Sequence, residues 1–242
     1  NHRIRKIVIS TGVVTTLAGS SQGSTDATGT SASFYYPSGI TTDGTNLYVA
    51  DRYNHRIRKI VISTGVVTTL AGSSQGSTDA TGTSASFYRP VAITTDGTNL
   101  YVADYNNHRI RKIVISTGVV TTLADSGFTY PRGITTDGTN LYVADRNNDR
   151  IQKIVISTGV VTTFAGSVQG YTDDTGTSAS FYYPRGITTD GTNLYVSDTN
   201  NHKIRKIVIS TGVVTTLAGG TRAFTDATGT SARFNFPQGI TT

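Results

Sequence analysis

Cysteine, methionine, tryptophan and glutamate are all absent from this chain of 242 residues. Without cysteine the chain can form neither a disulfide nor a thiolate metal site. Without glutamate, any carboxylate chemistry rests on aspartate alone. No apolar run is long enough to cross a bilayer, so no membrane insertion is expected. The lack of methionine, even at the first position, indicates a processed product or a segment of a longer chain.

Positive charge is in moderate excess, with 21 Lys and Arg against 15 Asp and a formal net charge of +6. Of these cations, 14 lie in five segments of the type HRIRKI, so the charge follows a repeat. A basic patch could meet nucleic acid, an anionic glycan or a membrane surface. The interpretation favoured here is simpler: duplication multiplies one solvent-exposed position.

The chain is a tandem repeat. Near-copies of NHRIRKIVISTGVVTTLAG begin at Asn1, Asn54, Asn107, Asn148 and Asn201, with spacings of 53, 53, 41 and 53 residues. Periods of this size are typical of stacked or radial arrays of one small structural unit. The whole chain is therefore predicted to be a single domain built from these copies.

Each copy predicts four short strands, as the second copy shows. The segments NHRIRKIVIS (54–63) and VVTTLA (66–71) are separated by the turn STG, and AITT (92–95) and LYVAD (100–104) by the Asp-Gly turn DGTN. Helical periodicity is lacking. Strands that are apolar on both faces need sheets on either side, which a ring of blades supplies. The predicted fold is all-β, a β-propeller of four-stranded antiparallel blades.

The segment LYVADRYNHRIRKI (47–60), preceded by GITTDG (39–44), resembles the NHL repeat, which is named after an Asn-His-Leu-type signature. The third position here is Arg or Lys instead of Leu. The resemblance recurs in every copy and is closest in style to arrays in bacterial extracellular proteins, which implies an extracellular or cell-surface location. It also implies the strand order within a blade: GITT innermost, then LYVAD, then HRIRKI, with VVTTLA outermost.

The number of strands leaves the closure of the propeller open. The chain starts with the third strand of a blade and ends with the first, GITT (239–242), and it has four strands of the LYVAD type against five of each other type. Either five blades close with one lacking its second strand, or the chain forms part of a six-bladed ring completed by other residues. An incomplete blade has unpaired strand edges, through which copies could self-assemble.

Histidine recurs at one position of the repeat, but no metal site is expected there. Strands lie about 4.8 Å apart, which puts equivalent turns of neighbouring blades ~10 Å or more from one another. Zinc ligands lie at about 2 Å from the metal. A histidine that hydrogen-bonds within its turn or to the next blade is favoured, and Asp149, which replaces it in one copy, could accept similarly. The histidines are His2, His55, His108 and His202.

Aspartate recurs at two positions, the DGTN turn and the end of the LYVAD strand, and both are expected to hydrogen-bond their own turns. No two of these carboxylates pair within a blade, and no Ser or Thr has a neighbouring base. No catalytic residue and no cofactor is therefore predicted, and the chain is not expected to be an enzyme. The two sets are Asp43, Asp96, Asp137 and Asp190, and Asp51, Asp104, Asp145 and Asp198.

A long polar loop, 19–39 in the first copy, precedes each inner strand except in the third copy, which omits twelve residues. In the first copy the loop offers a single carboxylate, Asp26, whereas a typical calcium loop concentrates several. Because the third copy keeps Phe128 and Pro131, the omitted part is predicted to be dispensable to the scaffold. Phenylalanines near the loop end are expected to plug the space between blades: Phe34, Phe87, Phe181 and Phe234.

The strands are almost identical between copies, so the differences are the informative positions. They gather on the loop-rich rim, just before the inner strand and just after the second strand. Aromatic and Arg side chains around a concave channel mouth suit a planar, anionic or sugar-like ligand, and neutral drift of loop positions is the alternative. The predicted ligand-binding residues are Tyr36, Arg89, Tyr130, Arg132, Tyr183, Arg185, Phe236 and Gln238 before the inner strands, and Arg52, Tyr105 and Arg146 after the second strands.

The leading hypothesis is a non-catalytic binding or structural scaffold module of a secreted or cell-surface bacterial protein, with a protein or glycan ligand on the rim. A nucleic-acid-binding propeller, as in tripartite-motif NHL proteins, is less favoured because the strand-borne cations need not share a face with the rim residues. A metal-dependent, lyase-like propeller enzyme is the third possibility, and it would need histidines at the propeller axis, where the pattern places none.

Overall fold

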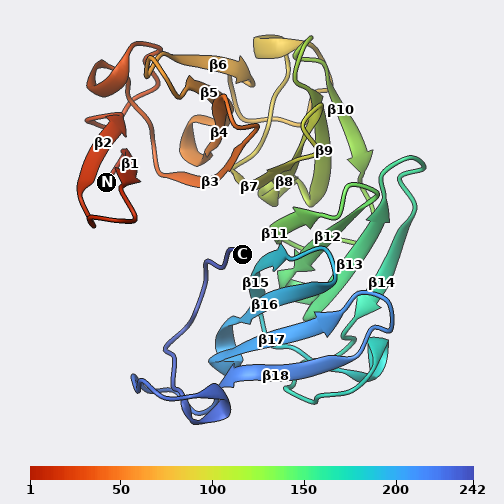
Figure 1. Cartoon of the computed structure of the whole chain (residues 1–242). Coiled ribbons are helices and arrows are strands. Elements are labelled where there is room, and N and C mark those ends of the chain that lie inside the picture. Colours follow the sequence, from red (N-terminus) through yellow and green to blue (C-terminus); the bar gives the residue numbers. More distant parts are fainter. The chain divides into compact units, whose positions relative to one another are not determined.

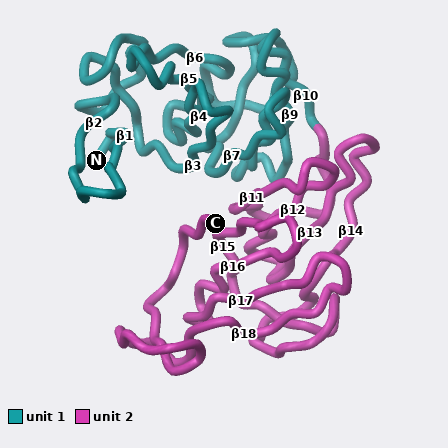
Figure 2. The backbone as a smooth tube through the Cα atoms, viewed as in Figure 1, with its two compact units in different colours: residues 1–122 teal, residues 123–242 magenta.

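The computed structural model describes residues 1–242 and consists of β-strands, short 3-10 turns and loops. None of its helical turns has the length and apolar character that crossing a membrane requires. The chain divides into two compact units, residues 1–122 and residues 123–242, which Figure 2 shows in teal and magenta. They are called the N-terminal unit and the C-terminal unit below.

The N-terminal unit contains a two-stranded sheet followed by two four-stranded sheets, all antiparallel (Figure 1). The two-stranded sheet is β1 (Ile4–Ile7) and β2 (Val14–Ala18). The next sheet is β3 (Pro37–Thr42), β4 (Asn46–Asp51), β5 (Arg56–Val61) and β6 (Val67–Ala71). The last is β7 (Pro90–Thr95), β8 (Asn99–Asp104), β9 (Arg109–Val114) and β10 (Val120–Ala124), whose end crosses into the second unit.

The C-terminal unit contains two further four-stranded sheets. One is β11 (Pro131–Thr136), β12 (Asn140–Asp145), β13 (Arg150–Val155) and β14 (Val161–Ala165). The other is β15 (Pro184–Thr189), β16 (Asn193–Asp198), β17 (Lys203–Val208) and β18 (Val214–Gly219). In every four-stranded sheet the spatial order follows the chain, and the first strands of successive sheets, β3 with β7 and β11 with β15, pack together. This confirms the predicted propeller blades and their strand order.

The predicted inner strand at Gly239–Thr242 is not formed. Every other GITT-type strand pairs with a strand of the LYVAD type, and this copy has none in the sequence. Thr242 instead donates a side-chain hydrogen bond to the carbonyl of Thr189, at 2.9 Å. The part of the fifth copy that follows β18 therefore contributes loops and one 3-10 turn to the C-terminal unit, while the two-stranded sheet of β1 and β2 lacks its two inner strands.

The hairpin turns follow from their sequence. In DGTN the Oδ1 atom of Asp43 accepts the backbone N–H groups of Thr45 and Asn46, at 2.8 and 2.6 Å. Gly44 has a φ of +89°, a conformation that costs glycine nothing. The Tyr48 hydroxyl donates to the other carboxylate oxygen at 2.8 Å, which ties the turn to strand β4. The prediction that these aspartates hydrogen-bond their own turns is confirmed.

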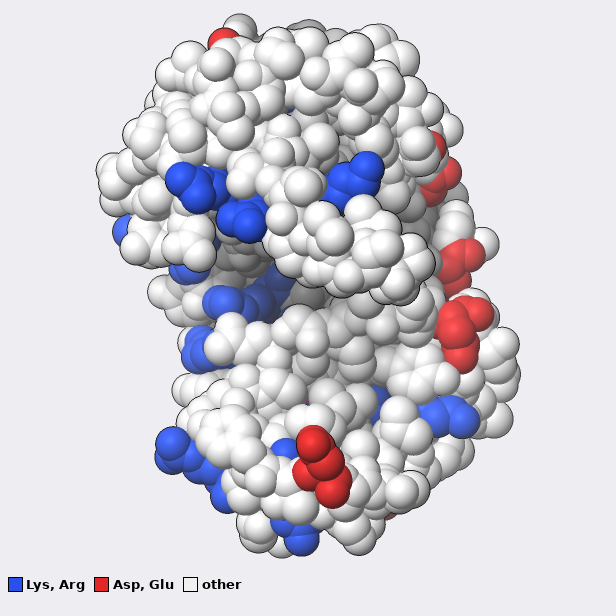
Figure 3. Space-filling model, turned by 60° about the vertical axis from the view of Figure 1, so that its left-hand side comes forward, with Lys and Arg blue, Asp and Glu red and all other residues white.

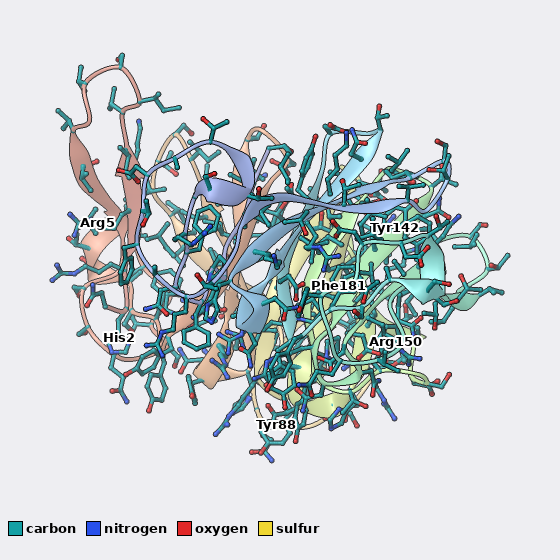
Figure 4. All side chains as sticks on the ribbon, turned by 90° about the horizontal axis from the view of Figure 1, so that it is seen from below. His2, Arg5, Tyr88, Tyr142, Arg150 and Phe181 are labelled. Atoms are coloured by element: carbon teal, nitrogen blue, oxygen red, sulfur yellow. The ribbon has the colours of Figure 1, made fainter.

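Blades are held together by apolar residues that point at the neighbouring blade. In the N-terminal unit, Phe87 lies in one cluster with Tyr48 and Ile57 of the preceding blade and Leu100 of its own. Phe181 joins the two blades of the C-terminal unit in the same way, and Figure 4 labels it among their side chains. The predicted plugs are confirmed as buried at Phe34, Phe87 and Phe181, whereas Phe234 is only half-buried. Phe128, which the third copy keeps, is buried as well.

One cation of the repeat is not solvent-exposed, contrary to the interpretation from the sequence. Arg58 has a side-chain exposure of 0 %, and its guanidinium donates to Asp51 at 2.8 Å and to Asp26 at 2.6 Å. It also donates to the carbonyl oxygens of Ser33 and Thr25. A buried charge is tolerated only when it is paired and hydrogen-bonded, and this network meets that condition. The same network forms around Arg111 and Arg205.

The long loop supplies half of each network, so its role in the scaffold is larger than predicted. Asp26 in the loop pairs with Arg58 and accepts the backbone N–H of Thr69 in the outer strand. In the third copy the loop is short and this aspartate is missing, and in the strand β13 that follows, at the start of the fourth copy, Gln152 stands in the place of the arginine. Gln152 donates to the carbonyl of Gly127 at 3.0 Å. The loop is therefore dispensable only where the buried arginine is absent as well.

Candidate functional site

The turn between the second and third strands of a blade is built on a buried aspartate. Asp51 is fully buried and accepts hydrogen bonds from the Asn54 side chain at 2.8 Å and from the backbone N–H of Tyr35 at 2.7 Å. Between them, residues Arg52–Asn54 form a single 3-10 turn, η2. The expectation that the strand-end aspartates anchor this turn is confirmed, and the anchor also fixes the end of the long loop at Tyr35.

The repeated histidine connects one blade to the next. His55 ends the 3-10 turn in the left-handed conformation, with φ of +58°, and its Nδ1 atom accepts the backbone N–H of Arg89 at 3.1 Å. His2 and His202 accept from Tyr36 and Phe236 in the same way. Asp149 replaces the histidine and accepts from Tyr183 at 2.7 Å. The predicted structural role of this position, including the aspartate substitute, is confirmed.

Accepting through Nδ1 requires this nitrogen to be unprotonated. Burial lowers the pKa of His55, and the positive charge of Arg89 lowers it further. Burial also lowers the pKa of His202. The neutral form that the hydrogen bond needs is therefore favoured in the folded chain, and the link between blades is present at neutral pH.

Substituting His55 tests this link. We expect H55A to lower the free energy of unfolding by about 1–2 kcal/mol, because the Arg89 N–H then has no acceptor. We expect H55D to stay within about 1 kcal/mol of the parent chain, because Asp149 occupies the same position in another copy. Urea denaturation of the full chain at pH 7.5 measures both, and an equal loss for the two variants would contradict the assignment.

The first set of predicted ligand-binding residues shares an unusual backbone conformation. Each residue that directly precedes the inner-strand proline has a positive φ, between +51° and +56°. Such values are uncommon outside glycine and asparagine, so the backbone there must be held by its surroundings. The hydrogen bond to the histidine or aspartate of the preceding turn provides this restraint. The residues are Tyr36, Arg89, Tyr130, Tyr183 and Phe236.

The other predicted residues lie close by on the same edge of each unit. Arg132 and Arg185 follow the prolines at the start of β11 and β15, and Gln238 is exposed in the C-terminal loop. Arg52, Tyr105 and Arg146 are the first residues of the 3-10 turns η2, η4 (Tyr105–Asn107) and η5 (Arg146–Asn148). Thr199, at the same place in the fourth complete blade, is buried instead and donates to the carbonyl of Pro237 at 2.7 Å.

The structure brings several of these side chains into contact across blades. In the N-terminal unit the Arg89 guanidinium lies 4.8 Å from the ring centre of Tyr53, and that of Arg52 lies 5.1 Å from the same ring. In the C-terminal unit Arg146 lies 4.3 Å from the ring centre of Tyr183. Phe236 instead contacts His202, with ring centres 4.6 Å apart. Ligand binding at these residues stays a prediction.

Tyr53 was missed in the prediction from the sequence, although it lies between both arginines. Its backbone N–H donates to the carbonyl of Tyr35, and the equivalent residue does the same in the other complete blades. A signal was available: the other three copies carry asparagine here, at Asn106, Asn147 and Asn200, so Tyr53 is also a difference between copies.

The DGTN turns join the first and second strands of each blade, and the pKa values of their aspartates are lowered. Hydrogen bonds from the Asn193 backbone and side chain lower the pKa of Asp190. For Asp43, partial burial acts to raise the pKa, but hydrogen bonds from Asn46 and Tyr48 outweigh it and the pKa is lowered. Burial and the bond to Asp43 raise the pKa of Tyr48 to about 12. At neutral pH the two aspartates are therefore charged and the Tyr48 hydroxyl is neutral, which suits their role as hydrogen-bond partners in the turn.

The lowered pKa values of the DGTN aspartates predict that the stability of the folded chain depends on pH. A carboxylate with a lower pKa in the folded chain stabilises it above the unfolded pKa of about 4, and this contribution is lost as the pH falls toward the folded pKa. We expect the free energy of unfolding to fall between pH 4 and pH 2. A variant with all four DGTN aspartates replaced by asparagine keeps the acceptor oxygens but does not titrate there. Its free energy of unfolding should change less steeply with pH than that of the parent chain. Equal slopes in urea titrations of both chains would contradict this.

The NHL repeat family matches the chain at residues 34–60, 87–113 and 181–207. Human NHL repeat-containing protein 2 is 38 % identical over 107 residues, which cover 42 % of this chain and 15 % of that protein. The chicken protein of the same name is 33 % identical over 134 residues, which cover 50 % of this chain and 18 % of that protein. The chain thus spans less than a fifth of the length of these relatives.

Solved structures show the same fold at low identity. A protein of unknown function from Bacteroides thetaiotaomicron has a TM-score of 0.60 and 22 % identity, covering 94 % of this chain and 70 % of that chain. A catalytically inactive virginiamycin B lyase from Staphylococcus aureus, solved with quinupristin, has a TM-score of 0.60 and 20 % identity over 89 % of this chain and 62 % of that chain. A chain of a nidogen/laminin complex has a TM-score of 0.55 and 18 % identity, covering 88 % of this chain and 89 % of that chain.

Proposed function

Since this chain carries NHL repeats folded into β-propeller blades, we propose that it is a non-catalytic binding or scaffold module that contacts its ligand through the rim. The rim consists of the residues just before the inner strands and just after the second strands. By the resemblance of its repeats to arrays in bacterial extracellular proteins, we place it in a secreted or cell-surface bacterial protein. A protein or a glycan is the ligand proposed.

One observation carries the proposal: the repeated polar side chains are engaged in the scaffold, whereas varying residues before the inner-strand prolines are held by it through their backbone. Asp43, Asp51 and His55 each hold backbone groups of a turn or of the next blade. Tyr36, Arg89, Tyr183 and Phe236 are each held through the backbone N–H group, so this hydrogen bond does not depend on which side chain the residue carries. A rigid frame with variable side chains at one edge suits binding.

A binding screen with a matched control tests the proposal. The immobilised full chain is exposed to panels of bacterial cell-envelope glycans and peptides, together with a triple variant, R52T, R89Y and R146T. Each substitution introduces the residue that another copy carries at that place. We expect a ligand that the parent chain retains and the triple variant loses, whereas K59Q, on strand β5, keeps it. Retention by the triple variant, or no ligand in any panel, would contradict a binding role at the rim.

The likeness to virginiamycin B lyase makes a lyase activity the second candidate. That likeness, at 20 % identity, concerns the fold. Incubation of the full chain with virginiamycin B, with and without added divalent metal, tests it directly. We expect the substrate to stay intact in both conditions, and turnover that scales with the amount of chain would replace the binding proposal with an enzymatic one.

A further inference from the structure

The excess positive charge is concentrated in the N-terminal unit. Residues 1–122 contain eleven Lys and Arg against six Asp, while residues 123–242 contain ten against nine. All six aspartates of the N-terminal unit are engaged, two in DGTN turns and four in the networks of Arg58 and Arg111. In the upper part of Figure 3, which shows this unit, the blue and red side chains lie in separate places. Several cations of the unit are thus without a carboxylate.

Arg52 and Arg89 are the two such cations on the rim. Neither guanidinium pairs with a carboxylate. Their contacts are with aromatic rings: both with Tyr53, Arg52 also with Tyr105 at 5.7 Å, and Arg89 with Tyr88 at 5.8 Å. Stacking on rings fixes the plane of a guanidinium while its N–H groups stay available at the edges. Two oriented guanidiniums around one ring form an anion-binding arrangement.

Further aromatic side chains extend this cluster. Tyr35 and Tyr36 lie with their ring centres 5.1 and 5.3 Å from that of Tyr53, and His2 lies 5.0 Å from Tyr36. Tyr36 is 54 % exposed, so this ring offers a free face beside the two cations. Figure 4, seen from below, labels His2 and Tyr88 along one margin of the N-terminal unit. An exposed ring next to paired guanidiniums fits a flat, partly apolar ring that bears an anionic group.

We propose that this cluster binds an acidic sugar of a polysaccharide, with the sugar ring on Tyr36 and its carboxylate or sulfate between Arg52 and Arg89. The inference rests on the proposed function and names the ligand class of the rim in the N-terminal unit. Nucleic acid is a poorer fit. Single strands are held by several exposed aromatic rings along a cationic track, whereas here the Tyr53 ring is already flanked by two arginines and two tyrosines.

The chain provides its own comparison for this site. In the C-terminal unit, asparagine takes the place of Tyr53, and Arg146 donates to the Asn147 side chain at 2.6 Å. Arg146 also stacks on Tyr183, with its guanidinium 4.3 Å from the ring centre. The variant Y53N therefore replaces the central ring by a residue that the same turn accommodates in three other copies. K59Q removes one cation on strand β5, outside this cluster, and serves as the charge-matched control.

Affinity electrophoresis of the full chain tests the proposal with polygalacturonate and dextran sulfate as probes and neutral dextran as the reference. We expect retardation by at least one acidic polymer, none by dextran, and weakening as salt is raised from 50 to 300 mM. Each of Y53N, R52T and R89Y should lower the affinity about tenfold, since a charge-assisted contact is lost or misaligned. K59Q should leave it unchanged. Comparing the two acidic polymers separates carboxylate from sulfate recognition.

Three results would overturn the acidic-sugar site: no retardation by either acidic polymer, equal affinity of Y53N and the parent chain, or tighter binding of a single-stranded oligonucleotide than of both polymers. Thermal unfolding of each variant, expected within about 2 °C of the parent, shows that an affinity loss is not a folding loss. If the acidic polymers fail while the rim-dependent ligand of the binding screen is retained, the sugar assignment is wrong and the binding role stands. If both fail, the binding role falls as well.

Discussion

Replacing Arg111 by glutamine is expected to lower the free energy of unfolding by about 3–5 kcal/mol, the range measured when one partner of a buried ion pair is removed. Arg111 is fully buried and donates to Asp104, which is itself fully buried, and to Asp79 in the long loop. Glutamine cannot bridge both carboxylates, and Asp104, whose pKa burial already raises, loses the guanidinium that stabilises its charged form. Urea denaturation of the full chain, followed by tyrosine fluorescence, measures the loss.

Lys112 is the matched control, because it carries the same charge on the same strand and is not buried. K112Q should cost less than about 1 kcal/mol, as expected for an exposed or half-exposed cation. Equal losses for R111Q and K112Q would show that the network does not stabilise the blade. The comparison therefore separates the buried pair from the general effect of removing a positive charge.

The loop and the arginine should also be energetically coupled. A variant in which residues 72–86 are replaced by Asp-Ser-Gly, the sequence of 125–127, removes Asp79 and reproduces the short loop of the third copy. In that background the cost of R111Q should drop by about 1–3 kcal/mol, because one partner of the arginine is already gone. Additive losses in this double-mutant cycle would contradict the coupling that Gln152 and the short loop suggest.

The second large effect is expected at Gly133, in the inner strand β11. A Cβ atom built there overlaps the backbone carbonyl oxygen of Arg185 and lies 3.1 Å from atoms of Ile187. Backbone atoms of a neighbouring strand cannot move aside as a side-chain tip can, so the two blades would have to separate. We expect G133A to lower the free energy of unfolding by about 3 kcal/mol.

The reverse substitution in another blade provides the control. Ala92 occupies the equivalent place in β7 and already carries a Cβ atom. A92G should cost about 1 kcal/mol or less, through the greater flexibility of glycine in the unfolded chain. Differential scanning calorimetry of both variants measures the difference. A loss at Gly133 no larger than that at Ala92 would show that the close approach of the inner strands is not limiting.

The strands, the hairpin turns and the histidine link could be predicted from the sequence because their causes are local. The segments rich in Ile and Val, the Asp-Gly turn and the polar acceptor at His55 or Asp149 each act within a few residues or on the adjacent blade. Repetition strengthened every inference, since the same pattern was available up to five times in one chain.

The buried arginines could not be predicted from composition, because arginine is usually at the surface and its loop partners are distant in sequence. Asp26 lies 32 residues before Arg58, in a loop whose regular structure is limited to a short 3-10 turn. The joint change of a short loop in the third copy and Gln152 in the strand that follows was visible in the sequence but has meaning only once the contact is known. Tyr53 was missed for a related reason, because its importance comes from arginines on two blades.

The left-handed residues before the inner-strand prolines have a consequence for how such a molecule can change. Their conformation is held through their own backbone N–H group, which donates to a histidine or aspartate side chain of another repeat. Tyrosine, arginine and phenylalanine all occupy this place in the same chain. Single substitutions there could therefore alter what the surface recognises at little expense in folding, which makes these positions suitable for a combinatorial library and for natural diversification.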